Sequence, residues 1–358
     1  MPRTMGELRR LNLEWNRLCE AALERGLRRI EIPEIGRSVS VRPRAHFQIS
    51  RIEARARVVR LRAATAPFYA PDLSVPAGGL DTFGLEFEFI KRRRMVNGFS
   101  EVVSDSAIVE AVRASGIMAN AERLHHVSRD YWKLTTDGSL GRGAGREFVS
   151  PVLSGEAGFD QVRKVCRTMI ATGCRINRRC GLHAHIGVAN HTVESVRRIV
   201  KIFMKFDAVI DGFMAPSRRR NGSQGGYCRS NYVSNRDLFN SAMTFNELRN
   251  AVGQVTESAR YFKVNLTAIS RHHTVEFRQH QGTVDAHKTE MWVRFLLRVS
   301  SRVKVMDDQE IDLAPQTLEG LMALVGSNQA ETIYFTERTA WFARPDRTGR
   351  TNNPRRFQ

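Results

Sequence analysis

One segment constrains the fold more than any other, because residues 82–90 (TFGLEFEFI) alternate between apolar and other side chains. In an extended strand, successive side chains point to opposite faces. Phe83 and Phe87 therefore share one face. Glu86 and Glu88 share the other, where two carboxylates repel each other unless a positive group lies near them. The segment predicts a strand of an antiparallel sheet that is buried on one face only.

Three further segments show the same alternation, with charged or imidazole side chains gathered on one face. They are residues 180–188, 261–266 and 274–280, and their polar faces carry His183, His185, Tyr261, Lys263, Asn265, Glu276, Arg278 and His280. For any one segment, the plain interpretation is the solvated face of a half-buried sheet. Four such faces, flanked by glycines that let a ligand approach, together favour a binding site for a divalent cation and a polyphosphate.

Two loops add charged groups to these strands. Glu147 lies just before a short strand-like segment, after the glycine-rich loop 137–145. The basic loop 216–232 is able to close over phosphate groups, although a solvated surface loop is an equally good interpretation. Its candidate phosphate contacts are Arg218, Arg219, Arg220 and Arg229.

Cysteines and histidines allow a competing metal hypothesis. Residues 174–185 contain two thiols and two imidazoles that zinc accepts as ligands, namely Cys174, Cys180, His183 and His185. Their spacing fits no common zinc motif, so structural zinc is the minor hypothesis. The chain has 5 cysteines in scattered positions, an odd number that favours reduced thiols over a disulfide framework.

The net charge of +19 limits the partners of the chain. A strongly basic surface attracts nucleotides, nucleic acid or other polyanions without naming one of them. No run of apolar residues approaches the roughly 20 needed to span a membrane, and the N-terminus lacks the apolar core of a signal peptide. We therefore expect a cytoplasmic protein that does not bind membranes and makes a weak polyanion or nucleic-acid contact through its basic N-terminal segment.

Composition divides the chain into three parts. Residues 5–29 predict an amphipathic helix, and the Pro/Gly-rich residues 66–79 predict a linker. We therefore expect a basic N-terminal extension (1–78), a main domain (79–343) and a basic disordered tail (344–358). Within the main domain, helical periodicity predicts helices at residues 105–114, 158–172, 192–214 and 285–301.

The ordered motifs resemble a known family. FGLEFEF, DGSL…REFVSPVLSG, CGLHAHIGV and FKVNL…HHTVEFRQHQGTVD occur in this order between residues 80 and 300. The set resembles the amidoligase family of carboxylate–amine ligases, which is often encoded in phages and is distantly similar to glutamine synthetase and glutamate–cysteine ligase. The resemblance implies an α+β, glutamine-synthetase-like domain, in which helices pack on the outer face of a curved antiparallel β-sheet. The basic helical N-terminal extension lies outside it.

The resemblance also implies roles for individual residues. The metal ligands would be Glu86, Glu88, Glu147, His183 and Glu276. His185 and Arg278 would contact ATP, and Glu276 and Arg278 would form the catalytic pair at the transferring phosphate. From charge and position alone, we add Lys263 as a catalytic cation, and Arg220 and Arg229 as further ATP contacts.

These residue types suit the chemistry of amide formation. A carboxylate is a poor acylating agent, so ATP first converts it to an acyl phosphate, which an amine then attacks. Mg²⁺ or Mn²⁺ and arginine neutralise charge during phosphoryl transfer, and a site carboxylate or His185 accepts the proton of the amine. The longer glutamate- and ammonia-binding segments of glutamine synthetase are missing. The carboxylate and amine substrates therefore stay open and include peptides and other macromolecules.

Two other hypotheses remain. A metal-dependent phosphotransferase on the same scaffold would need the same phosphate site but would form no amide. A nucleic-acid-binding or virion-associated protein without catalysis would account for the net charge. It predicts aromatic residues interleaved with basic ones on a binding face, a pattern that is weak around Phe47 and Phe68.

Overall fold

The chain divides into two compact units, residues 1–73 and 74–358. The computed structural model describes residues 29–32, 37–40, 81–91, 93–96, 99–123, 128–140, 145–220, 222, 225–256 and 260–344. In the first unit it describes an antiparallel hairpin of β1 (Arg29–Ile32) and β2 (Arg37–Ser40), which the sequence did not predict. The predicted amphipathic helix before this hairpin, the linker at 66–79 and the tail beyond residue 344 lie outside the described residues. The two boundaries between the three predicted parts therefore stay predictions.

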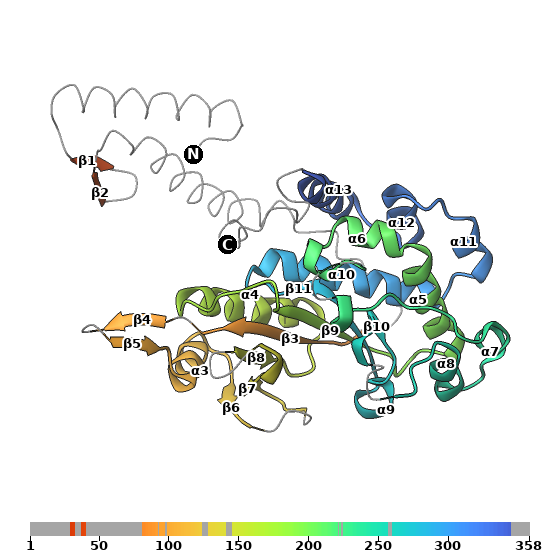
Figure 1. The fold of residues 1–358 in the computed structure, drawn as a ribbon, viewed down its shortest axis with the longest axis horizontal. Coiled ribbons are helices and arrows are strands. Elements are labelled where there is room, and N and C mark those ends of the chain that lie inside the picture. Colours follow the sequence, from red (N-terminus) through yellow and green to blue (C-terminus); the bar gives the residue numbers. More distant parts are fainter. Residues whose placement is uncertain are drawn as a thin grey trace. The chain divides into compact units, whose positions relative to one another are not determined.

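A seven-stranded sheet forms the centre of the second unit, in the order β10-β11-β9-β3-β8-β7-β6 (Figure 1). Its strands are β3 (Phe83–Ile90), β6 (Ala119–Ala121), β7 (Trp132–Thr136), β8 (Gly145–Val149), β9 (Gly181–Gly187), β10 (Val264–Asn265) and β11 (Thr274–Gln281). Neighbouring strands are antiparallel except β6 and β7, which are parallel. The α+β fold class is thus confirmed, but the sheet is mixed at the β6 edge rather than wholly antiparallel. A separate hairpin joins β4 (Arg93–Val96) and β5 (Phe99–Val102).

Helices surround this sheet. They are α3 (Asp105–Ala114), α4 (Gly155–Ala171), α5 (Val193–Lys205), α6 (Asp207–Gly212), α7 (Arg236–Ser241), α8 (Phe245–Ala251), α9 (Ile269–His272), α10 (Ala286–Val303), α11 (Asp308–Leu313), α12 (Leu318–Leu324) and α13 (Gln329–Ala343), with short 3₁₀ turns η2 (Gly138–Leu140), η3 (Pro216–Arg218) and η4 (Gly225–Tyr227). The predicted helix at 192–214 is two helices, α5 and α6, that meet at Phe206 without a glycine or proline to mark the break. Of the helices described, none combines the length and the apolar character that crossing a membrane requires.

Helices α4, α5 and α10 pack on the apolar face of the sheet (Figure 1). The ring of Phe83 stacks on Phe159 of α4 with centroids 5.0 Å apart, and Phe277 of β11 lies 5.1 Å from Phe203 of α5. Each fully buried phenylalanine contributes about 2 kcal/mol of hydrophobic stabilisation. The predicted apolar face of β3 is therefore confirmed, and the glutamates of β3 lie on the opposite face.

A β-bulge between Phe277 and His280 interrupts β11. An inserted residue reverses the faces of the side chains beyond it. His280, which the alternation placed on the polar face, consequently points into the helices, where its ring centroid lies 5.7 Å from that of Trp292 on α10. The prediction for His280 is therefore wrong, while Glu276 and Arg278 keep their places on the polar face.

Candidate active site

The polar faces of the central strands meet in one row of side chains. Glu86 lies opposite His183 across β3 and β9. Glu276 lies opposite His185 across β11 and β9, and opposite Asn265 across β11 and β10. The strand register thus brings together residues from four segments that are far apart in the sequence.

Two groups of metal-donor atoms share Glu86. One group consists of Glu86, Glu147 and His183, and the other of Glu86, His185 and Glu276. Within each group, one ligand atom from every residue lies within 4.8 Å of the others. Carboxylate oxygens and imidazole nitrogens are donors that divalent cations accept. Either group could therefore hold a divalent cation, and Glu86 belongs to both.

Glu86 contacts both histidines. Its Oε2 lies 2.9 Å from His183 Nδ1, and its Oε1 lies 3.3 Å from His185 Nε2. Burial raises the pKa of Glu86, but the two neighbouring histidines outweigh burial and hold that pKa well below its ordinary value. Burial lowers the pKa of His185, but Glu86 outweighs it and raises that pKa. His185 Nδ1 lies 2.9 Å from Thr274 Oγ1, so Nε2 is the nitrogen directed at the donor group.

Glu147 has a less favourable electrostatic environment. Burial and the nearby charges of Glu86 and Glu88 raise its pKa well above the ordinary value. Ionising all three carboxylates therefore costs free energy in the metal-free protein. A bound cation would relieve this repulsion.

Arg278 supplies a fixed positive charge beside the donor groups. Its Nη1 pairs with Glu276 Oε1 and lies 3.4 Å from His183 Nδ1. Burial raises the pKa of Glu276, but Arg278 and His185 outweigh burial and lower it. Glu276 also accepts a hydrogen bond of 2.6 Å from Asn265 Nδ2. Asn265, to which the sequence interpretation gave no role, thus orients Glu276.

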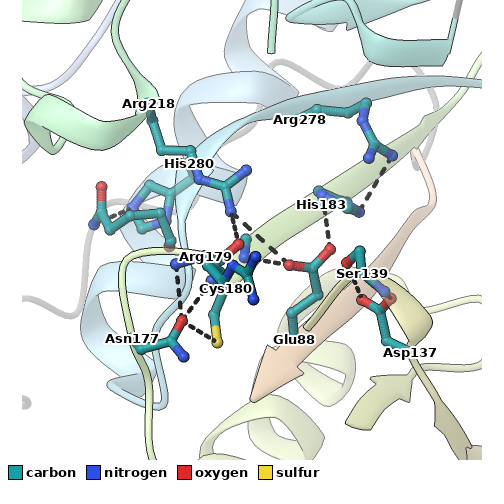
Figure 2. Close-up of polar contacts among 12 residues, drawn as sticks. Glu88, Asp137, Ser139, Asn177, Arg179, Cys180, His183, Arg218, Arg278 and His280 are labelled. Carbon is teal, nitrogen blue, oxygen red and sulfur yellow. Dashed lines mark hydrogen bonds and ion pairs between the residues drawn. The ribbon is translucent and has the colours of Figure 1, made fainter. Parts of the chain in front are cut away.

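Glu88 lies at the other end of the row, under the basic loop. Its Oε2 accepts a hydrogen bond of 2.6 Å from the Gly181 N–H and lies 3.9 Å from Arg218 Nη2 (Figure 2). Only 2% of the Arg218 residue is exposed. Of the four arginines considered in this loop, Arg218 is therefore the one that reaches the carboxylates.

The other predicted cations have different surroundings. Arg220 and Arg229 are exposed, and the guanidinium of Arg229 lies 4.6 Å from the ring centroid of Phe262. Lys263 is buried, and its Nζ lies 2.6 Å from Asp207 and 2.7 Å from Asp211 on α6. An ammonium group neutralised by two carboxylates is not available to a phosphate. This arrangement does not support the predicted role of Lys263.

Cysteines take no part in the donor groups. Among the described residues, these groups contain glutamates and histidines alone. Burial raises the pKa of Cys174 to about 11 and that of Cys180 to about 12. Both thiols are therefore protonated at neutral pH, and the structure gives no support to the zinc hypothesis.

A sheet face with clustered carboxylates, imidazoles and a buried arginine defines a site suited to cations and phosphate groups. Residues 81–300 match the family described as "Putative amidoligase enzyme", and the chain belongs to this family. Membership indicates a ligase-type enzyme. One matching solved structure is described as "Crystal structure of novel glutamine synthase homolog"; it is 13% identical, with a TM-score of 0.33, over 82% of this chain and 72% of that chain. Among curated proteins, none has a sequence that matches.

Proposed function

We propose that the protein joins a carboxylate to an amine at the expense of ATP, with Mg²⁺ or Mn²⁺ held on the polar face of the sheet. The observation that carries this proposal is the pair of donor groups that share Glu86 and lie beside Arg278. A phosphotransfer site needs cations and a guanidinium close together, because the reaction is catalysed mainly by positioning and charge neutralisation. Family membership adds the amide-forming chemistry.

The residues present fit a divalent cation. His185 Nε2 is buried, makes no hydrogen bond within the described part of the chain, and lies 3.3 Å from Glu86 Oε1. A nitrogen in this position is suited to bind a metal ion. The holding residues would be Glu86, Glu147, His183, His185 and Glu276. A bound cation would neutralise the negative charge of the phosphate groups.

The first chemical step is phosphoryl transfer from ATP. An oxygen of the substrate carboxylate attacks the γ-phosphorus, the bond from that phosphorus to the bridging oxygen breaks, and ADP leaves with the electron pair. The product is an acyl phosphate. Arg278, oriented by its ion pair with Glu276, would contact the oxygens of the transferring phosphate, where its planar fork suits two of them.

The second step forms the amide. The amine nitrogen attacks the acyl carbon, the bond from that carbon to the phosphate oxygen breaks, and inorganic phosphate leaves with the electron pair. The nitrogen must lose a proton, and the acceptors that the site offers are its carboxylates and His185. Both steps leave the protein unchanged.

Product analysis tests this proposal. Purified protein is incubated with ATP, Mg²⁺ and a panel of carboxylates and amines, and the products are identified by mass spectrometry. We expect ADP, phosphate and an amide in equal amounts, with one oxygen of an isotope-labelled carboxylate recovered in the phosphate. A phosphorylated acceptor without an amide would identify a phosphotransferase instead. If no pair of substrates leads to ATP consumption and the protein binds polyanions tightly, a binding protein without catalysis would be favoured.

A further inference from the structure

Glu88 differs from Glu86 in its partners, because a backbone N–H and a buried arginine lie beside one of its oxygens. Oε2 accepts the hydrogen bond from Gly181 N–H and lies near Arg218, and Oε1 lies 3.4 Å from His183 Nε2. Glu88 is opposite Glu147 in the sheet register. Even so, neither of the donor groups found among the described residues contains Glu88.

The ring of His183 presents its two nitrogens to different groups. Nδ1 lies 2.9 Å from Glu86 Oε2 and 3.7 Å from Glu276 Oε1, two members of the donor groups. Nε2 lies 3.4 Å from Glu88 Oε1 (Figure 2), and this buried nitrogen makes no hydrogen bond among the described residues. A cation beside Glu86 would therefore take Nδ1, and Nε2 would carry the proton.

We propose that Glu88 is a positioning residue, which accepts the Nε2–H of His183 and keeps the Nδ1 lone pair directed at the metal. Metal-bound histidines commonly donate their other ring N–H to a carboxylate, which fixes the tautomer and the ring orientation. A separation of 3.4 Å is long for a hydrogen bond, and contacts of this kind often shorten when the ligand binds. The inference rests on the proposed function, because it assumes a divalent cation beside Glu86.

Arg218 is fixed beside Glu88, with its Nη2 3.9 Å from Glu88 Oε2. Its Nη2 donates a hydrogen bond of 2.7 Å to the backbone oxygen of Arg179, and its own backbone oxygen accepts one of 3.2 Å from Cys228 Sγ. Anchored at both ends, the buried guanidinium provides the positive charge that Glu88 needs away from water.

Gly181 makes this packing sterically feasible. A Cβ at residue 181 would lie 2.9 Å from both Arg218 Nη2 and His183 Nε2, closer than real Cβ contacts. Gly84, on the same face beside His185, would place a Cβ 3.7 Å from its nearest neighbour, which is ordinary contact. The space beside Gly181 is therefore occupied by Arg218 and His183 and is not left to a ligand.

Manganese binding in the absence of nucleotide, measured by calorimetry, separates a ligand from a positioning residue. Glu86→Gln removes a donor shared by both groups, and we expect it to abolish binding. Glu88→Gln is expected to keep the number of bound ions and to lower the affinity about tenfold to a hundredfold. Glu110→Gln, an exposed carboxylate on α3, controls for the lost charge and should bind like the wild type. Equal loss of binding in Glu86→Gln and Glu88→Gln would overturn the proposal.

Variants of Arg218 test whether Arg218 and Glu88 both act through His183. Arg218→Gln should lower manganese affinity as much as Glu88→Gln does, and the double variant should lower it no further. Fully additive losses would contradict the proposal. Arg218→Lys keeps the charge and should keep part of the affinity, so it remains informative if Arg218→Gln fails to fold. Arg236→Gln, an exposed arginine on α7, is the matched control.

Nitrogen NMR of isotope-labelled histidine in the magnesium-loaded protein gives the tautomer directly. We expect His183 to carry its proton on Nε2, and Glu88→Gln to weaken this preference. The His183 signals are identified by their absence in His183→Asn. A proton on Nδ1 in the wild type would overturn the proposal. Neither measurement uses ATP, a carboxylate or an amine, so a protein that binds manganese but forms no amide would refute the proposed reaction and leave the metal site and this inference standing.

Discussion

The two ends of the candidate active site differ although the same strands build them. The open end contains Glu86, His185 and Arg278, and the closed end contains Glu88, Gly181 and Arg218. At the open end, the side chain of Glu86 is 25% exposed, and its partners are two histidines. At the closed end, the side chain of Glu88 is 8% exposed and is contacted by a backbone N–H and a buried guanidinium.

This difference shows that the face of a strand does not decide the role of its side chains. Glu86 and Glu88 are two residues apart on one face of β3, and they are chemically identical. Turn η3 carries Arg218 over Glu88 and leaves Glu86 to the histidines. We infer that ligands bind at the open end and that the closed end maintains the geometry.

The largest expected effect belongs to the open end. Glu86→Gln should lower ATP turnover about a thousandfold or more, because both donor groups lose the same carboxylate. Steady-state kinetics with the substrates found by product analysis measure this loss, and circular dichroism verifies the fold. Turnover within tenfold of the wild type would remove Glu86 from the site and break the comparison between the two ends.

A smaller kinetic effect is expected at Arg278. Arg278→Lys should lower turnover about a hundredfold, while ATP still binds within about tenfold, because the planar fork matters chiefly during phosphate transfer. Nucleotide binding by calorimetry and turnover are measured on the same preparation. Arg271→Lys, an exposed arginine on α9, serves as control. Unchanged turnover in Arg278→Lys would exclude the proposed phosphate contact.

The closed end should respond in stability. Glu88→Gln leaves the buried guanidinium of Arg218 without its carboxylate, and we expect the free energy of unfolding to fall by about 2–3 kcal/mol. Denaturant unfolding of the metal-free protein measures this change. No loss of stability would show that the Arg218 contact contributes little and that the closed end is not a structural element.

The two glycines of the polar face offer a matched pair. Gly181→Ala forces a Cβ against Arg218 and His183, and we expect a loss of about 1–3 kcal/mol in the free energy of unfolding. Gly84→Ala meets only ordinary contacts, so its loss should be clearly smaller. Thermal unfolding of both variants side by side tests the prediction. Equal losses would mean that the closed end is packed no more tightly than the open end.

The smallest expected effect concerns Glu147, where the substitution should stabilise the protein rather than destabilise it. Because its pKa is raised in the folded protein, the folded state retains a proton that the unfolded state releases as the pH rises above 4.5, the ordinary pKa of Glu. The contribution of Glu147 to the free energy of unfolding of the metal-free wild type should therefore fall as the pH rises from this value. Glutamine does not titrate, so Glu147→Gln should abolish this contribution to the pH dependence. The variant should also stabilise the metal-free protein by about 1 kcal/mol at neutral pH. Destabilisation by Glu147→Gln would show that its charge is already balanced.

Strand alternation predicted the faces of β3 and β9 because a strand buried on one side cannot slip by a residue without exposing its apolar side chains. It failed in β11 beyond Phe277, since a bulge depends on the neighbouring strand and leaves no mark in the local pattern. The sequence also failed to select the correct arginine among the consecutive arginines of the basic loop, for a different reason. Which of them turns inward depends on the 3₁₀ turn at Pro216, so composition identified the loop but not Arg218.

The bulge in β11 affects whether residues 81–300 can fold without the helices that follow them. By turning His280 toward the helices, it brings this ring within 3.4 Å of Arg338 on α13, which also donates to the backbone oxygen of Phe213. Helix α13 lies beyond residues 81–300, the stretch that the family match covers. A fragment cut at residue 300 would expose the buried surface behind the strand that carries Glu276 and Arg278. We therefore expect a fragment of residues 81–300 to be less stable than the whole second unit, which extends through α13.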